Sequence, residues 1–344
     1  MLKEIDDVLN QIKNVKNQNK NFSFGVIIIT SNQKSFQNFV LLPIKKINNI
    51  ICVSITIHKS TILNQLLKNI DGKVDYVIID SEQKIENFEN ITSKVLSQIK
   101  KSKVLTFKSN DHTANAVDAL IHEYSPNTPK KIFIIGIGNL GSKVASRLVE
   151  RGHIVFISGR NKEKTKKIAN AINLLKPKKC TGKIKSVSLT SIPKNCDILA
   201  AFTPSIPVIT KNMVQNLNKN SLIIDGGIRT IFPDAIKEAY SQGISLVRLD
   251  ARSGIFSALT LILETSNLVN KQIGKKSFFD QIMVSGGWIG QFGDIIVDNI
   301  YCPKQILGFA DGKGGSHQKY YDFSKKNMKS IQNDVELFKK NSFV

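Results

Sequence analysis

The 344-residue chain has few cysteines, few arginines and no long uncharged apolar run. Its four cysteines show no C-x-x-C spacing, which argues against a zinc site or a disulfide framework and favours reduced, buried thiols. No apolar run approaches the roughly 20 residues needed to span a bilayer, and the charged N-terminus is typical of neither a signal nor a transit peptide. We therefore expect a cytoplasmic protein with no metal site and no membrane partner.

Arginine is scarce although the chain is strongly basic. The formal net charge is +22, yet only 6 of the 49 basic residues are arginine. Specific readers of nucleic acid rely on the planar guanidinium group of arginine, so the composition argues against a nucleic-acid partner. An anionic small-molecule substrate or an acidic carrier fits the charge better.

The pattern of apolar runs predicts two α/β domains and a C-terminal extension. Short β-branched runs alternate with helix-like stretches over 1–125, and the alternation starts again after the proline-containing "YSPNTPK" (124–130). This alternation is typical of parallel sheets covered by helices. We predict α/β domains at 1–125 and 126–254, and a mostly helical segment at 255–344 that packs back on the first domain. The sequence does not decide whether the chain forms a homodimer.

A glycine motif follows the first predicted strand of the second domain. In "FIIGIGNLGS" (133–142), Gly136, Gly138 and Gly141 form G-x-G-x-x-G between a strand and a helix. In this setting the first glycine permits a tight turn, the second the approach of a pyrophosphate and the third close helix packing. The phosphate then lies on the helix N-terminus, at Asn139 and Leu140. The motif predicts a Rossmann domain over 126–254.

The end of the next strand indicates which dinucleotide binds. An NAD site has Asp or Glu here, whereas this sequence has "SGRNKEK", with Ser158, Arg160 and Asn161. Because a guanidinium group matches phosphate oxygens, an arginine with a small hydroxyl neighbour suits the 2′-phosphate of NADP. The alternative is that Arg160 is a solvated loop charge.

Two later strand ends are predicted to border the nicotinamide ring. "AFTPSIP" supplies Thr203 and Pro204, and "DGGIRT" supplies Gly226 and Gly227, which permit the close approach of a flat ring. Asp225, at the end of the same strand, is expected to cap the segment that follows.

These motifs resemble those of the amino-acid dehydrogenase-like superfamily, which includes shikimate dehydrogenase, methylene-tetrahydrofolate dehydrogenase and glutamyl-tRNA reductase. "GRNKEK" is similar to the phosphate clamp of shikimate dehydrogenases, and residues 196–228 resemble a stretch of methylene-tetrahydrofolate dehydrogenase. The resemblance implies an N-terminal α/β substrate domain, a doubly wound Rossmann NADP-binding domain and a C-terminal helical extension. It also implies an active site in the cleft between the two domains.

The same resemblance supplies candidate catalytic residues. "VSITIHKS" (53–60) is similar to the V-T-I-P-H-K motif of shikimate dehydrogenases, without its proline, and implies Lys59 as the catalytic lysine. Asp111 or His112 stands where the family has the partner acid. A lysine can handle the substrate proton if its surroundings lower its pKa; otherwise Lys59 is a surface charge. Arg252 either clamps a substrate carboxylate or pairs with Asp250.

The main prediction is an NADP-dependent dehydrogenase or reductase that acts on a C=O or C=N group of a small anionic metabolite or a pterin-like carrier. Two alternatives stay open. An acyl (thioester-type) reductase related to glutamyl-tRNA reductase would use Cys52 as nucleophile, although Cys52 lies within an apolar strand, where thiols are usually inert. A non-catalytic NADP-binding sensor or structural protein would explain why the family motifs are incomplete in the first domain.

Overall fold

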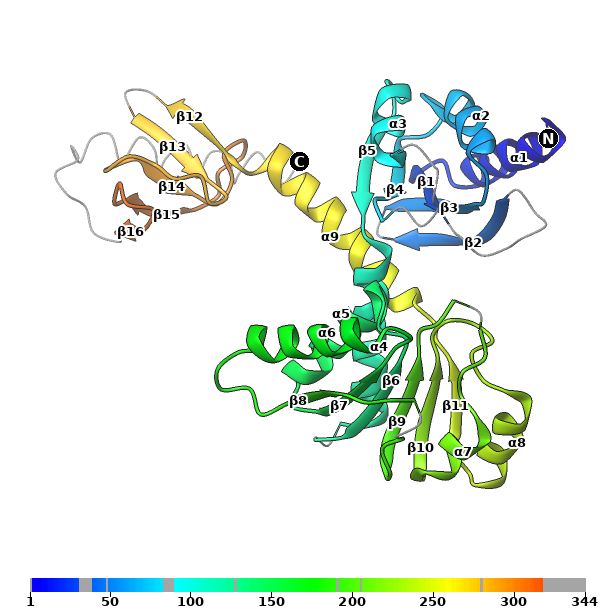
Figure 1. Ribbon diagram of the computed structural model, residues 1–344. Coiled ribbons are helices and arrows are strands. Elements are labelled where there is room, and N and C mark those ends of the chain that lie inside the picture. Colours follow the sequence, from blue (N-terminus) through cyan, green and yellow to red (C-terminus); the bar gives the residue numbers. More distant parts are fainter. Residues whose placement is uncertain are drawn as a thin grey trace. The chain divides into compact units, whose positions relative to one another are not determined.

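The protein is described from a computed structural model, which covers residues 2–30, 39–47, 49–82, 90–126, 129–189, 192–204, 206–278 and 281–317. The chain divides into two compact units, residues 1–259 and 260–344. Among the described residues, the first unit holds two sheets and the second holds one (Figure 1).

The first sheet has five strands in the order β2-β3-β1-β4-β5. β2 pairs antiparallel with β3 at the edge, and the other pairs are parallel. The inner strands β1 and β3 are rich in Val and Ile and almost wholly buried, as expected of a parallel sheet. The elements are α1 (Leu2–Gln18), β1 (Ser23–Thr30), β2 (Phe39–Ile47), β3 (Ile50–Ile57), α2 (Ser60–Ile70), β4 (Tyr76–Asp80), α3 (Ile91–Gln98) and β5 (Lys103–Phe107).

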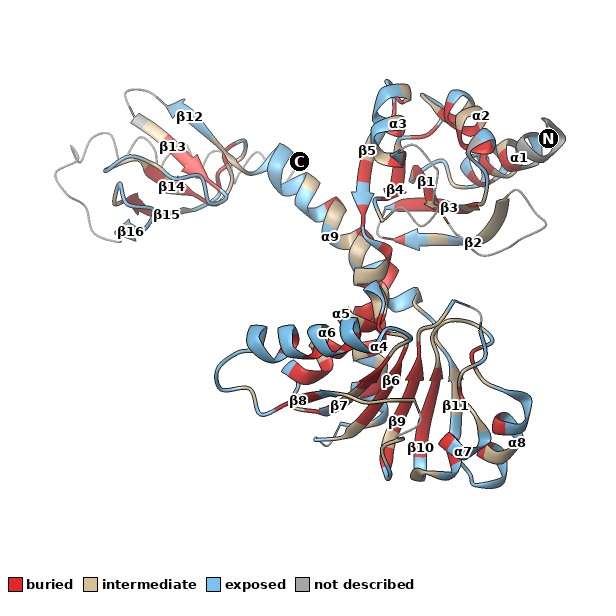
Figure 2. Cartoon of the chain, viewed as in Figure 1, coloured by how far each residue is buried: buried red, intermediate tan, exposed pale blue. Residues whose placement is uncertain are grey.

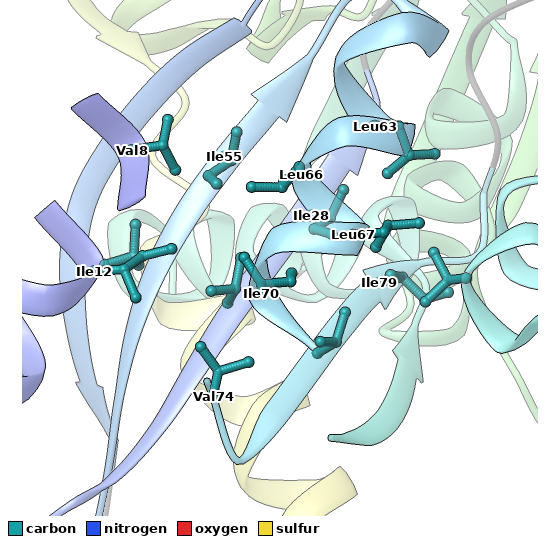
Figure 3. Packing of buried hydrophobic residues seen from close by; sticks show 14 of the residues in the cluster. Val8, Ile12, Ile28, Ile55, Leu63, Leu66, Leu67, Ile70, Val74 and Ile79 are labelled. Atoms are coloured by element: carbon teal, nitrogen blue, oxygen red, sulfur yellow. The ribbon is translucent and has the colours of Figure 1, made fainter. Parts of the chain in front are cut away.

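α1, α2 and α3 share one apolar core with this sheet. The apolar side chains of α1 and α2 recur at helical spacing, so each helix turns one stripe toward the strands. Figure 3 shows this packing, with Val8 and Ile12 of α1 and Leu63 and Leu66 of α2 near Ile28 of β1.

The second sheet has six parallel strands in the order β11-β10-β9-β6-β7-β8. Residues of α4, α5 and α6 form the core on one face, and residues of α7 and α8 form the core on the other (Figure 1). This doubly wound arrangement confirms the predicted α/β class. The elements are α4 (Ser109–Tyr124), β6 (Lys131–Ile135), α5 (Asn139–Glu150), β7 (Ile154–Ser158), α6 (Lys162–Leu175), β8 (Lys183–Ser186), β9 (Cys196–Ala201), α7 (Lys211–Gln215), β10 (Leu217–Asp225), α8 (Pro233–Ser241) and β11 (Ser245–Arg248).

The prediction of a mostly helical C-terminal segment is wrong over residues 274–317. After α9 (Arg252–Lys271), these residues form a five-stranded sheet in which only the pairing of β13 with β14 is parallel. Short apolar runs such as "QIMVS" and "ILGFA" each bury their last three residues there, while the glycine-rich stretches form the turns (Figure 2). The strands are β12 (Gly274–Phe278), β13 (Gln281–Ser285), β14 (Ile295–Val297), β15 (Ile306–Ala310) and β16 (Ser316–His317).

Residues 318–344, the end of the segment predicted to be mostly helical, lie outside the described part of the chain. None of the helices among the described residues is long and apolar enough to cross a membrane.

Candidate nucleotide-binding site

A pocket of about 320 Å³ lies where β6, β7 and β9 end. β6 and β9 are neighbours in the sheet. The chain runs from β6 to β7 in one direction across the sheet and from β9 to β10 in the other. The pocket therefore lies at the topological switch point, where open α/β sheets bind ligands. Its lining consists of Ile135, Gly136, Ile137, Gly138, Gly159, Arg160, Asn161, Lys164, Thr165, Leu189, Phe202, Thr203, Pro204, Ile206 and Val208.

The three motif glycines differ in why the chain needs them. Gly136 has a φ of +93°, and a Cβ there would lie 2.8 Å from the carbonyl carbon of Phe202. A Cβ on Gly141 would overlap with the carbonyl oxygen of Gly136. Gly138 has an ordinary φ of −81°, and a Cβ there would meet nothing within 4 Å. The fold itself explains the first and third glycines, whereas the second keeps open space in the pocket.

The N-terminus of α5 adjoins that open space. Gly138 is the N-cap residue and offers no side chain to the first backbone N–H groups of the helix. Such groups have no partner within the helix and attract anions. Asn139 accepts a hydrogen bond from the Asn110 side chain (3.2 Å), and Leu140 packs on the core. Neither of these two predicted residues is in the pocket lining, which contains Gly138 just before them.

Two cations lie on the other side of the pocket, after β7. Arg160 is in the lining as predicted, and so is Lys164, which sequence reasoning missed although it belongs to the same "GRNKEK" cluster. None of the described lining residues is acidic. The Asn161 side chain accepts from the backbone N–H of Lys164 (2.9 Å) and caps α6. Ser158 is buried and outside the lining, so its hydroxyl is not a phosphate ligand in this geometry.

The predictions for the strand ends after β9 and β10 need one correction. Thr203 and Pro204 line the pocket, but Gly226 and Gly227 do not. A Cβ on Gly226 would overlap with the ring of Phe202, and one on Gly227 with the carbonyl oxygen of Thr203. These two glycines therefore permit the close approach of the neighbouring loop, and the protein itself fills the space assigned to a flat ring. Asp225 caps the turn as expected, by accepting from the backbone N–H of Arg229 (2.8 Å) and the Thr230 hydroxyl (2.8 Å).

Among the described residues, Lys59 forms no ion pair with Asp111, one of its two candidate partners. Lys59 is exposed at the N-cap position of α2 and makes no side-chain cap. Asp111 pairs instead with Lys143 of α5, whose Nζ lies 2.7 Å from Asp111 and 2.6 Å from Glu82. Partial burial opposes both charges, but these contacts raise the pKa of Lys143 and hold that of Asp111 low. His112 is buried, with its ring centroid 5.6 Å from that of Phe107.

The Lys143 cluster links the first sheet to the nucleotide-binding helix. Glu82, just after β4, also accepts from the backbone N–H of Asn110 (2.5 Å) at the start of α4. The Asn110 side chain in turn donates to Asn139, the first residue of α5. No motif in the sequence predicts this network, because its members come from two helices, α4 and α5, and from the loop after β4.

The remaining candidate residues are Arg252 and Cys52, and the structure gives each of them a structural setting. Arg252 is exposed and pairs with Asp250 (2.6 Å), which is one of the two roles predicted for it. Cys52 is buried in β3, and burial raises the pKa of its thiol to about 12 although nearby Lys45 opposes this. A thiol with this pKa is almost wholly protonated at neutral pH and is a poor nucleophile.

Comparisons with known proteins agree with the superfamily resemblance. Residues 131–227 match the model of a family described as "NADP oxidoreductase coenzyme F420-dependent". Glutamyl-tRNA reductase from Thermosipho melanesiensis is 30% identical over 125 residues, which are 36% of this chain and 32% of that protein. The chain thus matches about a third of the length of this curated relative.

Solved structures with a related fold include two dehydrogenases. A shikimate dehydrogenase in complex with NADP⁺ is 14% identical, with a TM-score of 0.41, over 67% of this chain and 84% of that one. A quinate dehydrogenase from Corynebacterium glutamicum in complex with NAD is 16% identical, with a TM-score of 0.44, over 70% of this chain and 93% of that one.

Proposed function

We propose that the protein is an NADP-dependent oxidoreductase. The observation that carries the proposal is Gly138: the fold gives no steric reason for a glycine there, and the space it keeps open lies between a helix N-terminus and the side chains of Arg160 and Lys164. Such a space suits a pyrophosphate on the helix and a 2′-phosphate on the two cations. The absence of an acidic residue from the described lining supports NADP over NAD.

The proposed reaction is reduction or oxidation of a C=O or C=N group on a small anionic metabolite or a pterin-like carrier. NADPH, when bound, supplies the hydride. The chain must then supply one group that gives a proton to the substrate oxygen or nitrogen. Lys59 is proposed for this role from the family resemblance, although it is exposed and Asp111 pairs with Lys143. The acyl-reductase alternative loses support because its proposed nucleophile, Cys52, is a buried thiol with a raised pKa.

The test is calorimetric titration of the protein with NADPH and NADH, repeated with Arg160→Ala and Lys164→Ala. We expect tight NADPH binding that each variant weakens roughly tenfold to a hundredfold, the value of a lost charge-assisted hydrogen bond. NADH binding should change little, because NADH has no 2′-phosphate. Lys167→Ala is the matched control, since Lys167 is exposed on the same helix outside the pocket.

Three results would contradict parts of the proposal. Binding of neither nucleotide would mean that the glycine loop is only a turn. A preference for NADH would contradict the cofactor assignment. Nucleotide binding without oxidation of NADPH by any carbonyl or imine substrate would favour the non-catalytic alternative.

A further inference from the structure

Lysines gather on one corner of the second sheet. Nine of the 24 residues from 162 to 185 are lysine, against 43 in the whole chain, and Glu163 is the single acid among them. All but Lys176 are exposed, and none of them is in an ion pair with another described residue. Lys164 belongs to the nucleotide pocket. We call the other eight lysines, of α6, β8 and their connection, the α6–β8 lysine face.

The lysine content of this face exceeds the general basic character of the chain. Residues 274–317 carry four lysines and four aspartates, so that segment is neutral while residues 162–185 have a net charge of +8. Eight exposed like charges destabilise a folded surface through mutual repulsion. A partner of opposite charge would relieve this repulsion.

The face also has a concave part. A hollow of about 420 Å³ lies between α6 and β8, and its polar lining consists of Lys162, Lys166, Asn170, Lys185, Ser186 and Ser188. None of the described residues that line it is acidic. A carboxylate that enters this hollow meets three ammonium groups and short polar side chains.

Two leucines at the end of α6 indicate the kind of partner. Leu174 and Leu175 are 85% and 80% exposed, directly before Lys176, Lys178 and Lys179. Exposed apolar side chains beside charged ones are typical of a protein interface, in which an apolar centre is surrounded by a polar rim. Phosphates of a nucleic acid would leave these leucines without a partner.

We propose that the α6–β8 lysine face docks an acidic protein, with carboxylates on the lysines and in the hollow and an apolar patch on Leu174 and Leu175. Residues 162–188 contain no arginine and no aromatic side chain. This segment therefore cannot stack on the bases of a nucleic acid or make bidentate contacts with its phosphates. A flat bilayer surface would leave the hollow unfilled. The proposal goes beyond the proposed oxidoreductase activity and does not depend on it.

The test uses the full chain and a defined probe, a fluorescent helical peptide rich in Glu around two Leu, in fluorescence anisotropy titrations. We expect binding that Lys178→Glu, Lys179→Glu and Lys183→Glu together weaken at least about tenfold, because the rim charges are reversed. Leu174→Ser with Leu175→Ser should weaken binding about tenfold through loss of apolar burial. Carbodiimide cross-linking and mass spectrometry should place the peptide carboxylates on the α6–β8 lysine face.

The matched control reverses three exposed lysines elsewhere in the same domain, Lys194→Glu, Lys219→Glu and Lys237→Glu, and should leave peptide affinity unchanged. Equal weakening by these control changes would overturn the proposal, because it would show a general effect of net charge. Absence of peptide binding would also overturn it. So would binding of a short RNA duplex, or of phosphatidylglycerol vesicles, that is tighter than peptide binding and depends on the same lysines.

Discussion

Gly138 is a position where the fold does not require glycine but the binding of a pyrophosphate would. Its backbone is in a conformation that any residue adopts, and the space beside it is open. Gly138→Ala should therefore cost about 1 kcal/mol or less, the penalty for alanine at an N-cap position, yet place a methyl group where a pyrophosphate would lie.

We expect this variant to unfold at nearly the wild-type denaturant concentration and to bind NADPH at least about tenfold more weakly. Gly141→Ala is the contrast, because its Cβ would overlap with Gly136 and destabilise the protein itself. Unchanged NADPH affinity in Gly138→Ala would place the pyrophosphate elsewhere.

His153 makes the stability of the protein depend on pH. It is buried, and its Nδ1 accepts from the backbone N–H of Lys130 (3.1 Å). Burial, assisted by the charge of Arg151, lowers the pKa of His153 below the ordinary 6.5. Below pH 6.5 the unfolded chain therefore takes up a proton that the folded chain excludes, so stability falls as the pH falls.

The unfolding free energy should decrease by up to about 1.4 kcal/mol per pH unit below that point, down to the folded-state pKa. Urea unfolding at a series of pH values checks this, with His153→Asn as the comparison, because the asparagine oxygen can accept the same hydrogen bond but does not titrate. An equal pH dependence in both proteins would assign the effect to other groups.

At the scale of elements, α6 combines a helix cap with a phosphate site. Asn161 caps the helix, and Arg160 and Lys164 on either side of it line the pocket. Asn161→Ala should destabilise the protein by about 1 kcal/mol. Asn161→Asp keeps a capping oxygen but adds a negative charge beside the proposed 2′-phosphate.

We therefore expect Asn161→Asp to retain the wild-type melting temperature and to weaken NADPH binding more than NADH binding. Thermal melts and calorimetry on the same samples separate the two effects. An equal loss of affinity for NADPH and NADH would argue against a 2′-phosphate near Asn161.

The strands that the sequence predicts are those with continuous Val and Ile runs, since such runs are buried on both faces of a parallel sheet. The sequence pattern does not predict β2, because "FVLLPIKKI" contains a proline and two lysines. These residues are compatible with an edge strand, which is the position of β2 in the sheet. The strands of residues 274–317 were not predicted because β14 and β16 have only three and two residues, and because glycine-rich stretches separate β13 from β14 and β15 from β16.

The candidate site was predictable where its residues are close in sequence and not where they come from distant elements. The glycine loop and "GRNKEK" each lie on one strand-to-helix connection, so their spacing alone places them together. The partner of Asp111 is Lys143, which is 32 positions further along the chain and comes close only through the packing of α4 against α5. Gly226 and Gly227 were misassigned because close approach of a neighbouring loop and of a ligand require the same residue type.

At the scale of the whole molecule, the nucleotide pocket and the C-terminal sheet belong to different compact units. Every described residue that lines the pocket lies between Ile135 and Val208, whereas the second unit begins at residue 260. The first unit has apolar cores of its own, as a part of the chain able to fold alone requires. A chain that ends after Lys271 keeps α9 whole, including the buried Ile255 and Leu259 that belong to the first unit.

We expect this truncated chain to melt cooperatively and to bind NADPH within about twofold of the full chain, because its pocket and the cores beneath it are complete. Arg160→Ala in the truncated chain should weaken NADPH binding as much as it does in the full chain, which shows that the same site is measured. Cooperative melting with lost NADPH affinity would instead mean that residues beyond 271 contribute to the nucleotide site. The second unit would then have to be part of the binding machinery, and the pocket at the ends of β6, β7 and β9 would be only part of the site.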